Sequence, residues 1–318
     1  EVTNPFDGSR IGVIDTASRD DVDEAVAGAV ECFHTVMKQL PRFERSAILR
    51  NIARLIREGE EELTNIVVAE AGKPIRDVRR EIGRAAGLLE LAADHLSVET
   101  GQIIPMDIVP SGVNRTGIVT RVPVGVVAAI APSNSPVNLT INKVAPAIAV
   151  GNTVVLKPAD QTPFSALWLA DAFTRAGLPD HAFNVVIGGV EEVAEPLVRH
   201  PRVRMVTITG GVPAGLAVAR AAGIKKVTLE LGSSAANIVR HDADITEAAR
   251  SLATSAFLSS GQACISAQRL IVHSSVVDQF VKEFVARAEA MKIGDPKDPE
   301  TEIGPMVSQA QVERVLGW

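Results

Sequence analysis

The chain has 318 residues, of which 46% are hydrophobic and 22% are charged, and its formal net charge at pH 7 is −6. A chain of this length and composition buries a sizeable core in one or two domains, which excludes a disordered or fibrous protein. It has no Tyr and no basic stripe interleaved with aromatic residues, so we expect no nucleic-acid partner.

Membrane and secreted proteins also have little support. The longest apolar stretch, from Val124 to Ile130, is far too short to span a membrane, so we expect no membrane partner. Cys32 and Cys264 do not form a disulfide framework, and reduced thiols suit the cytoplasm. No basic-then-apolar signal segment opens the sequence, and we predict a cytoplasmic protein.

The first hundred residues have apolar side chains at helical spacing. One helix follows Asp20 and Asp21, a second begins at Pro41, and a third runs from about Ile75 toward Leu96. We interpret Cys32 as a packing residue and His34 as a surface residue of the first helix. The charged side of the third helix is interpreted as a solvated face, formed by Arg76, Arg79, Arg80 and Glu81.

After residue 104 the pattern changes to that of strands. Period-two alternation predicts two strands, 106–109 and 115–120, around the turn Pro110-Ser111-Gly112. Short, wholly apolar runs then alternate with helical segments, which is typical of a parallel sheet buried on both faces. These runs are 124–131, 153–156, 183–187, 205–207 and 226–229.

The unusual strings of this sequence follow the predicted strands, where parallel sheets bind ligands. Asn134 lies between Pro132 and Pro136, which would hold its amide rigidly as a donor to an oxyanion, although the string is also a plain turn pattern. Lys157 and Asp160 follow the next strand. They form either a binding site for the adenosine ribose or a surface ion pair.

A glycine turn follows the run that begins at Met205. Gly210 and Gly211 precede a helical segment, and their backbone N–H groups would approach a pyrophosphate at the positive end of that helix. The string is not the Gly-x-Gly-x-x-Gly fingerprint, and alone it is a weak indication.

The pair Cys264 and Glu230 carries the strongest chemical signal. Each lies in a string of small and apolar residues with a glycine, Gly261-Gln262-Ala263-Cys264 and Leu229-Glu230-Leu231-Gly232, and 34 residues separate them. A thiol and a carboxylate in such settings suit a nucleophile and its base. Taken by itself, Cys264 could also be a small buried hydrophobic residue, as most free cysteines are.

Together and in this order, these strings resemble the aldehyde dehydrogenase superfamily, over nearly the whole chain from Asn4-Pro5 to Gly304-Pro305. The resemblance implies Cys264 as nucleophile, Glu230 as general base, Asn134 as oxyanion donor and Lys143 in a proton relay. It implies NAD or NADP as the cofactor and no metal. The cofactor-binding residues that it implies are Ile130, Pro132, Lys157, Asp160, Gly210, Gly211 and Leu231.

The fold that the resemblance implies is α/β, with a Rossmann-type parallel-sheet cofactor domain at 1–104 and 122–232. A β-strand oligomerisation arm at 105–121 and a partial α/β catalytic domain at 233–318 complete it. The family's Glu-x-Phe-Gly-Pro string is absent, and we expect a chain truncated at its C-terminus that forms a homodimer or homotetramer when full length.

Several positions depart from the family pattern. Ser133 and Ser135 replace aromatic residues beside Asn134, and Ser233-Ser234 replaces a Gly-Lys pair, which favours a short, oxygenated or anionic aldehyde as substrate. Asp160 replaces a glutamate. A carboxylate beside the 2′-hydroxyl repels a 2′-phosphate, so we predict NAD over NADP.

We therefore predict the oxidation of such an aldehyde to the acid through a cysteine thiohemiacetal and a thioester. Two alternatives stay open at this point. A CoA-acylating dehydrogenase would pass the acyl group to CoA, and Glu230 argues against it. A catalytically silent NAD-binding homologue is disfavoured by the presence of Cys264, Glu230 and Asn134.

Overall fold

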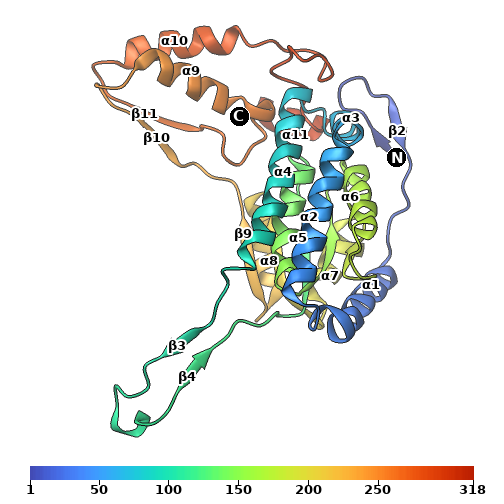
Figure 1. The fold of residues 1–318 in the computed structure, drawn as a ribbon. Coiled ribbons are helices and arrows are strands. Elements are labelled where there is room, and N and C mark those ends of the chain that lie inside the picture. The colour runs from blue at the N-terminus through green and yellow to red at the C-terminus, as the bar shows by residue number, and fades with distance from the viewer.

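A computed structural model describes all 318 residues, and its centre is a five-stranded parallel sheet (Figure 1). The strand order is β7-β6-β5-β8-β9. The predicted strands are confirmed with ends shifted by up to two residues, as β5 (Val126–Ile130), β6 (Thr153–Lys157), β7 (Phe183–Val185), β8 (Val203–Thr209) and β9 (Lys226–Glu230).

The sheet is buried on both faces because its central strands alternate between two cores. Val127 and Ala129 of β5 face the larger core, while Val126 and Ala128 face the smaller one. Each of these four side chains is at most 2% exposed. Apolar residues at every position, rather than at alternate ones, are therefore what a central parallel strand requires.

Helices cover both faces of the sheet (Figure 1). On one face lie α5 (Pro136–Ala149) and α6 (Pro163–Arg175), with α2 (Arg42–Glu58), α3 (Glu60–Ala71) and α4 (Ile75–His95) outside them. On the other face lie α1 (Arg19–Cys32), α7 (Glu195–Arg199) and α8 (Val212–Ala222). The three predicted N-terminal helices are confirmed as α1, α2 and α4, and α3 is an additional helix directly after Gly59.

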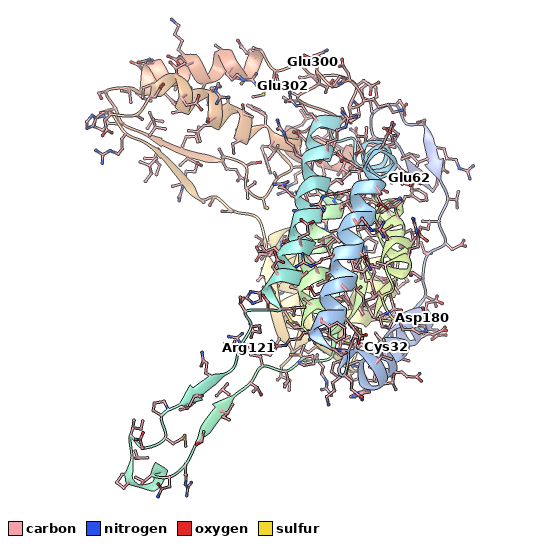
Figure 2. All side chains as sticks on the ribbon, in the orientation of Figure 1. Cys32, Glu62, Arg121, Asp180, Glu300 and Glu302 are labelled. Carbon is pink, nitrogen blue, oxygen red and sulfur yellow. The ribbon has the colours of Figure 1, made fainter.

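A smaller unit lies apart from this body (Figure 1). Strands β10 (Ala236–Val239) and β11 (Arg269–Val272) form a parallel pair, and α9 (Ile245–Ala256) and α10 (Val277–Glu289) pack beside it around Phe280. Near the end of the chain, residues 292–307 return to α4. There the Ile75 N–H donates to the Pro296 carbonyl at 2.8 Å, and Glu302 pairs with Arg76 and Arg287 (Figure 2).

Three further short elements lie near the ends of the chain. Strands β1 (Val2–Thr3) and β2 (Arg10–Gly12) pair antiparallel near the N-terminus. Helix α11 (Gln309–Leu316) follows the segment that returns to α4.

A two-stranded arm projects from the body between α4 and β5 (Figure 1). It pairs β3 (Gln102–Ile104) with β4 (Gly117–Val119), so the prediction of a strand at 106–109 was wrong. Pro105 and Pro110 bound that segment and lack an N–H to donate to a ladder, and residues 110–112 form a 3₁₀ turn. At the base, Arg121 forms an ion pair with Glu99 at 3.3 Å (Figure 2).

The two interpretations of the first helix are confirmed. Cys32 is 6% exposed, and burial, helped by the nearby negative charge of Asp180, raises the pKa of its thiol to about 11 (Figure 2). His34 is exposed. No helix of the chain is both long enough and apolar enough to span a membrane.

Candidate active site

The predicted functional residues gather at one edge of the sheet, where the parallel strands end. Ile130 at the end of β5 is paired with Lys157 on β6 and with Ile208 on β8, and Thr209 on β8 is paired with Glu230 on β9. Strand order reverses at β5, because the chain goes outward through β6 and β7 and then returns to β8 on the other side. Such a reversal opens a ligand-binding crevice at the carboxyl ends of the strands.

Asn134 connects this edge to the loop that carries the thiol. Its side-chain Nδ2 donates a hydrogen bond of 2.6 Å to the backbone carbonyl of Gln262, two residues before Cys264. Its Oδ1 is buried without a partner. An amide nitrogen has two N–H groups, so one remains to meet a ligand. The structure thus brings the predicted oxyanion donor to Gln262, 128 positions away, in the loop of the predicted nucleophile.

The loop before Cys264 has an unusual backbone. Ser259, Ser260 and Gly261 have φ values of 51°, 59° and 75°, three left-handed residues in succession. For the two serines this conformation costs about 1–2 kcal/mol each, so the surroundings must hold it. Cys264 itself is half-buried. Residues in strained conformations cluster at functional sites, and the serine–serine–glycine run is a signal that sequence reasoning missed.

The strained loop is held by the segment that returns to α4. Ser260 Oγ donates to the Gly304 carbonyl at 2.7 Å, and the Val307 N–H donates to Gln262 Oε1 at 3.0 Å. A Cβ at Gly304 would overlap the carbonyl oxygen of Gly72, so only glycine allows the segment to approach so closely. Residues 304–307 therefore support the thiol loop through hydrogen bonds to Ser260 and Gln262.

Lys143 lies on α5 and is 6% exposed. Its Nζ donates to Thr209 Oγ1 at 2.5 Å, at the end of β8. Burial lowers the pKa of Lys143 to about 8, and the negative charge of Glu230 partly opposes that fall. The amine can therefore gain and release a proton near neutral pH, which is what a proton relay requires.

Glu230 is the last residue of β9, and its side chain is exposed. Its carboxylate forms no hydrogen bond or ion pair, while its backbone carbonyl accepts a hydrogen bond of 3.0 Å from the Gly210 N–H. The backbone is thus fixed, and the carboxylate stays available to accept a proton.

The glycine turn opens helix α8, as predicted. Gly211 precedes the helix, and no side chain caps its first turn. A Cβ at Gly210 or Gly211 would make only ordinary contacts, so packing within the chain does not demand glycine at either position. The uncapped N–H groups and the open space before them fit an anionic ligand such as a pyrophosphate.

Leu231, another predicted cofactor residue, packs against helix α8. A Cβ at Gly215 on α8 would come within 2.5 Å of the Leu231 side chain. Leu231 therefore fixes α8 against β9.

Lys157, the last residue of β6, and Asp160 form an ion pair of 2.6 Å. The side chain of Lys157 is 9% exposed and that of Asp160 is 54% exposed. Both alternatives from the sequence, a ribose site and an ion pair, are compatible with this arrangement. Asp160 also lines a cavity of about 730 Å³ between residues 1–5 and 305–309, which none of Asn134, Gly210 and Cys264 line.

A second ion pair, between Lys73 and Glu81, was not predicted from the sequence. It corrects the interpretation of Glu81 as part of a solvated face of α4. Glu81 is fully buried and not part of a solvated face, because it pairs with Lys73 at 2.6 Å. Arg79 and Arg80 do face outward. Arg76, however, is half-buried and pairs with Glu302, so the prediction of a solvated face is wrong for Arg76 as well. Elsewhere, no group of three or more His, Cys, Asp or Glu side chains is arranged to hold a metal ion.

Comparisons with known proteins agree with this geometry. The family model described as "Aldehyde dehydrogenase family" matches residues 1–318. A 3-sulfolactaldehyde dehydrogenase of Priestia aryabhattai is 39% identical over 318 residues, which are 100% of this chain and 66% of the relative. The chain thus spans about two thirds of the length of that relative.

Two solved structures are also similar. An NAD-dependent aldehyde dehydrogenase from Sinorhizobium meliloti matches with a TM-score of 0.95 and 37% identity, covering 99% of this chain and 63% of that one. A glyceraldehyde-3-phosphate dehydrogenase from Methanocaldococcus jannaschii, complexed with NADP, matches with a TM-score of 0.93 and 37% identity, covering 99% and 69%. The chain therefore belongs to the aldehyde dehydrogenase family.

Proposed function

We propose that this protein oxidises a short, oxygenated or anionic aldehyde to the carboxylic acid, with NAD or NADP as the hydride acceptor. The observation that carries the proposal is the hydrogen bond from Asn134 to Gln262, since it holds an amide donor beside the loop of Cys264 at the strand-reversal crevice. A thiol beside an oxyanion donor is the arrangement that attack on a carbonyl needs.

In the first step the Cys264 thiolate attacks the aldehyde carbon, and the carbonyl electron pair moves to the oxygen. The free N–H of the Asn134 amide and the Cys264 backbone N–H would stabilise this oxyanion, as in other acyl-transfer sites. A bound nicotinamide would supply the acceptor for the hydride that leaves this carbon. A thioester on Cys264 remains.

In the second step water replaces the thiolate. Glu230 takes a proton from the water, the water oxygen attacks the thioester carbon, and the carbon–sulfur bond breaks. Lys143, with its pKa lowered to about 8 by burial, would pass the proton onward through Thr209. The exposed, unpaired Glu230 carboxylate supports hydrolysis over transfer to CoA.

The cofactor would be held by the glycine turn and by the pair after β6. Gly210 and Gly211 would meet the pyrophosphate, with Ile130 and Pro132 beside it, and Lys157 with Asp160 would bind the adenosine ribose. The relatives fit either dinucleotide, since one is named as NAD-dependent and another was solved with NADP. The Asp160 carboxylate favours NAD, because it would repel a 2′-phosphate.

The substrate class follows from the residues around Asn134. Ser133 and Ser135 are small, so no aromatic ring flanks the amide; Ser133 is polar, and Ser135 turns its Oγ to Lys73. The relative named for 3-sulfolactaldehyde acts on a short aldehyde with hydroxyl and sulfonate groups. That chemistry agrees with small polar residues beside Asn134.

The arm would serve oligomerisation in a dimer or tetramer. Ile103, Ile108 and Ile118 on it are 78%, 80% and 68% exposed, which is costly for a surface that stays in water. Ile103→Asp with Ile118→Asp should reduce the molar mass measured by sedimentation. We also propose a cytoplasmic location, because both cysteines are free and Cys264 has to stay reduced.

An assay of NADH and acid formation, with and without CoA, tests the function. Short aldehydes with hydroxyl, carboxylate, sulfonate or phosphonate groups should yield NADH and free acid without CoA. Product that forms only with CoA would identify the acylating alternative, and no NADH with any aldehyde would identify a silent NAD-binding homologue.

A further inference from the structure

A buried ion pair lies behind the loop that carries Asn134. Lys73, between α3 and α4, and Glu81, on α4, are joined at 2.6 Å with side chains 6% and 0% exposed. Burying two charges is expensive, and the pair alone does not repay this cost unless further hydrogen bonds satisfy both groups. Those further bonds indicate what the pair does.

The other hydrogen bonds of the pair go to the Asn134 loop and to the first turn of α5. Lys73 Nζ donates to the Asn134 carbonyl at 3.2 Å and to Ser135 Oγ at 3.0 Å. Together with Glu81 these use all three N–H groups of the ammonium. The other oxygen of Glu81 accepts the N–H groups of Val137 and Asn138, at 2.9 Å and 3.1 Å.

Helix α5 depends on this outside carboxylate. Its own preceding residue, Ser135, makes no side-chain cap, so Glu81 fills that place from α4. The ammonium thus holds the loop just before the helix while the carboxylate holds the first turn of the helix. Together they fix the backbone on both sides of Pro136, close to Asn134.

The Asn134 side chain has little else to orient it. Its Oδ1 has no partner, and its Nδ2 makes one bond, to the Gln262 carbonyl. The direction of the amide therefore follows from where its backbone lies, and Lys73 bonds that backbone at the Asn134 carbonyl itself.

We infer that Lys73 and Glu81 are positioning residues for the oxyanion donor Asn134. The inference rests on the proposed function, since it gives the pair a part in carbonyl attack. Neither side chain touches the substrate in this account. They act by keeping the Asn134 amide within hydrogen-bond reach of the developing oxyanion.

The chain contains a matched control for a purely structural cap. Glu70 is 1% exposed and accepts the Phe164 and Ser165 N–H groups in the first turn of α6, at 2.9 Å and 3.2 Å. This is the same capping that Glu81 gives α5, but Glu70 has no lysine partner. Capping a buried helix start therefore does not require an ion pair, and Glu70→Gln separates loss of a cap from loss of positioning.

The test compares Lys73→Met, Glu81→Gln and Glu70→Gln in two reactions of the NAD-loaded protein. One is the single-turnover burst of NADH at saturating aldehyde, which develops an oxyanion. The other is alkylation of Cys264 by iodoacetamide, which does not. Lys73→Met and Glu81→Gln should slow the burst by about tenfold or more and change alkylation by less than about twofold. Glu70→Gln should leave both rates within about twofold, and Lys73→Arg should recover most of the burst.

A double-mutant cycle with Asn134→Ala tests whether Lys73 acts through Asn134. If Lys73 acts through Asn134, Lys73→Met should cost no more than about twofold once Asn134 is alanine. Additive losses, or equal losses in the burst and in alkylation, would overturn the positioning role. Should Lys73→Met not fold, the same cycle with Glu81→Gln gives the decision. A wild-type protein that forms no NADH would overturn the proposed function instead, before any variant is compared.

Discussion

Lys143 on α5 and Thr209 at the end of β8 are joined by a hydrogen bond of 2.5 Å between Nζ and Oγ1. This contact places a buried amine beside the strand end that is paired with Glu230. Because burial lowers the pKa of Lys143 to about 8, both the reaction rate and the contribution of Lys143 to stability should depend on pH above about 8.

The pH dependence of Lys143 gives the first prediction. The steady-state rate should rise as pH passes through about 8, since only the neutral amine accepts a proton, and Lys143→Met should lack this step. From about 8 to the ordinary value of 10.5, the unfolded chain holds a proton that the folded chain has released. The free energy of unfolding should therefore rise with pH across that window.

Two measurements check this prediction. The first is the pH–rate profile of the wild type and of Lys143→Met. The second is the difference in their free energies of unfolding, measured in urea at about pH 7.5 and about pH 9.5, where wild type should gain relative to the variant. A difference that is constant with pH would contradict a lowered pKa.

Glu70 should show the opposite dependence. Burial raises the pKa of its carboxyl to about 7 from the ordinary 4.5, in spite of hydrogen bonds from Ser165 and Phe164. Between those values the folded chain holds a proton that the unfolded chain has released, so stability from this group is lost as pH rises toward 7. Thermal unfolding should show Glu70→Gln gaining on wild type between about pH 5 and about pH 8. A gain in stability of Glu70→Gln over wild type as the pH falls would contradict a raised pKa of Glu70.

Thiol labelling should separate the two cysteines. The pKa of Cys32, raised to about 11 by burial, leaves almost no thiolate at neutral pH, whereas Cys264 is half-buried beside the crevice. One thiol should react with iodoacetamide, and Cys264→Ala should slow the labelling by about tenfold or more. Cys32→Ala should leave the rate unchanged, and mass spectrometry of the labelled peptide identifies the site. Fast labelling of Cys32 would contradict the buried environment.

Asp160 should decide between NAD and NADP. Its exposed carboxylate would meet the 2′-hydroxyl of NAD, while the bond from Lys157 partly neutralises its charge. The ratio of kcat/KM for NAD to that for NADP should favour NAD in wild type and shift toward NADP in Asp160→Ala. Equal efficiency in wild type, with no shift in the variant, would show that the paired carboxylate does not discriminate.

Much of the fold could be predicted because its signals are local. Continuous apolar runs such as that of β5 mark a strand buried on both faces, and acidic residues at the start of α1 mark a helix N-terminus. The strand at 106–109 was predicted wrongly because alternating polarity does not show whether a neighbouring strand can pair with the segment. Prolines at both of its ends remove donors from a ladder, so the pairing moved to residues 102–104.

Some residues of the site could likewise be predicted from local sequence signals, and others could not. Residues such as Asn134 and Gly210 follow strands, and since strand ends meet at one edge, their proximity could be predicted. Glu81 could not be recognised, because its partner Lys73 and the first turn of α5 are joined to it only by tertiary packing. The left-handed backbone of Ser259 and Ser260 likewise depends on distant support, from Gly304.

The central claim is that Cys264 forms a thioester that Glu230 helps to hydrolyse, and pre-steady-state kinetics of Glu230→Gln tests it most directly. Mixing this variant with NAD and an aldehyde substrate should give a burst of about one NADH per site, followed by steady-state turnover far slower than in wild type. Cys264→Ala should show neither burst nor turnover. Loss of the burst together with turnover in Glu230→Gln would place the carboxylate before hydride transfer and contradict this account.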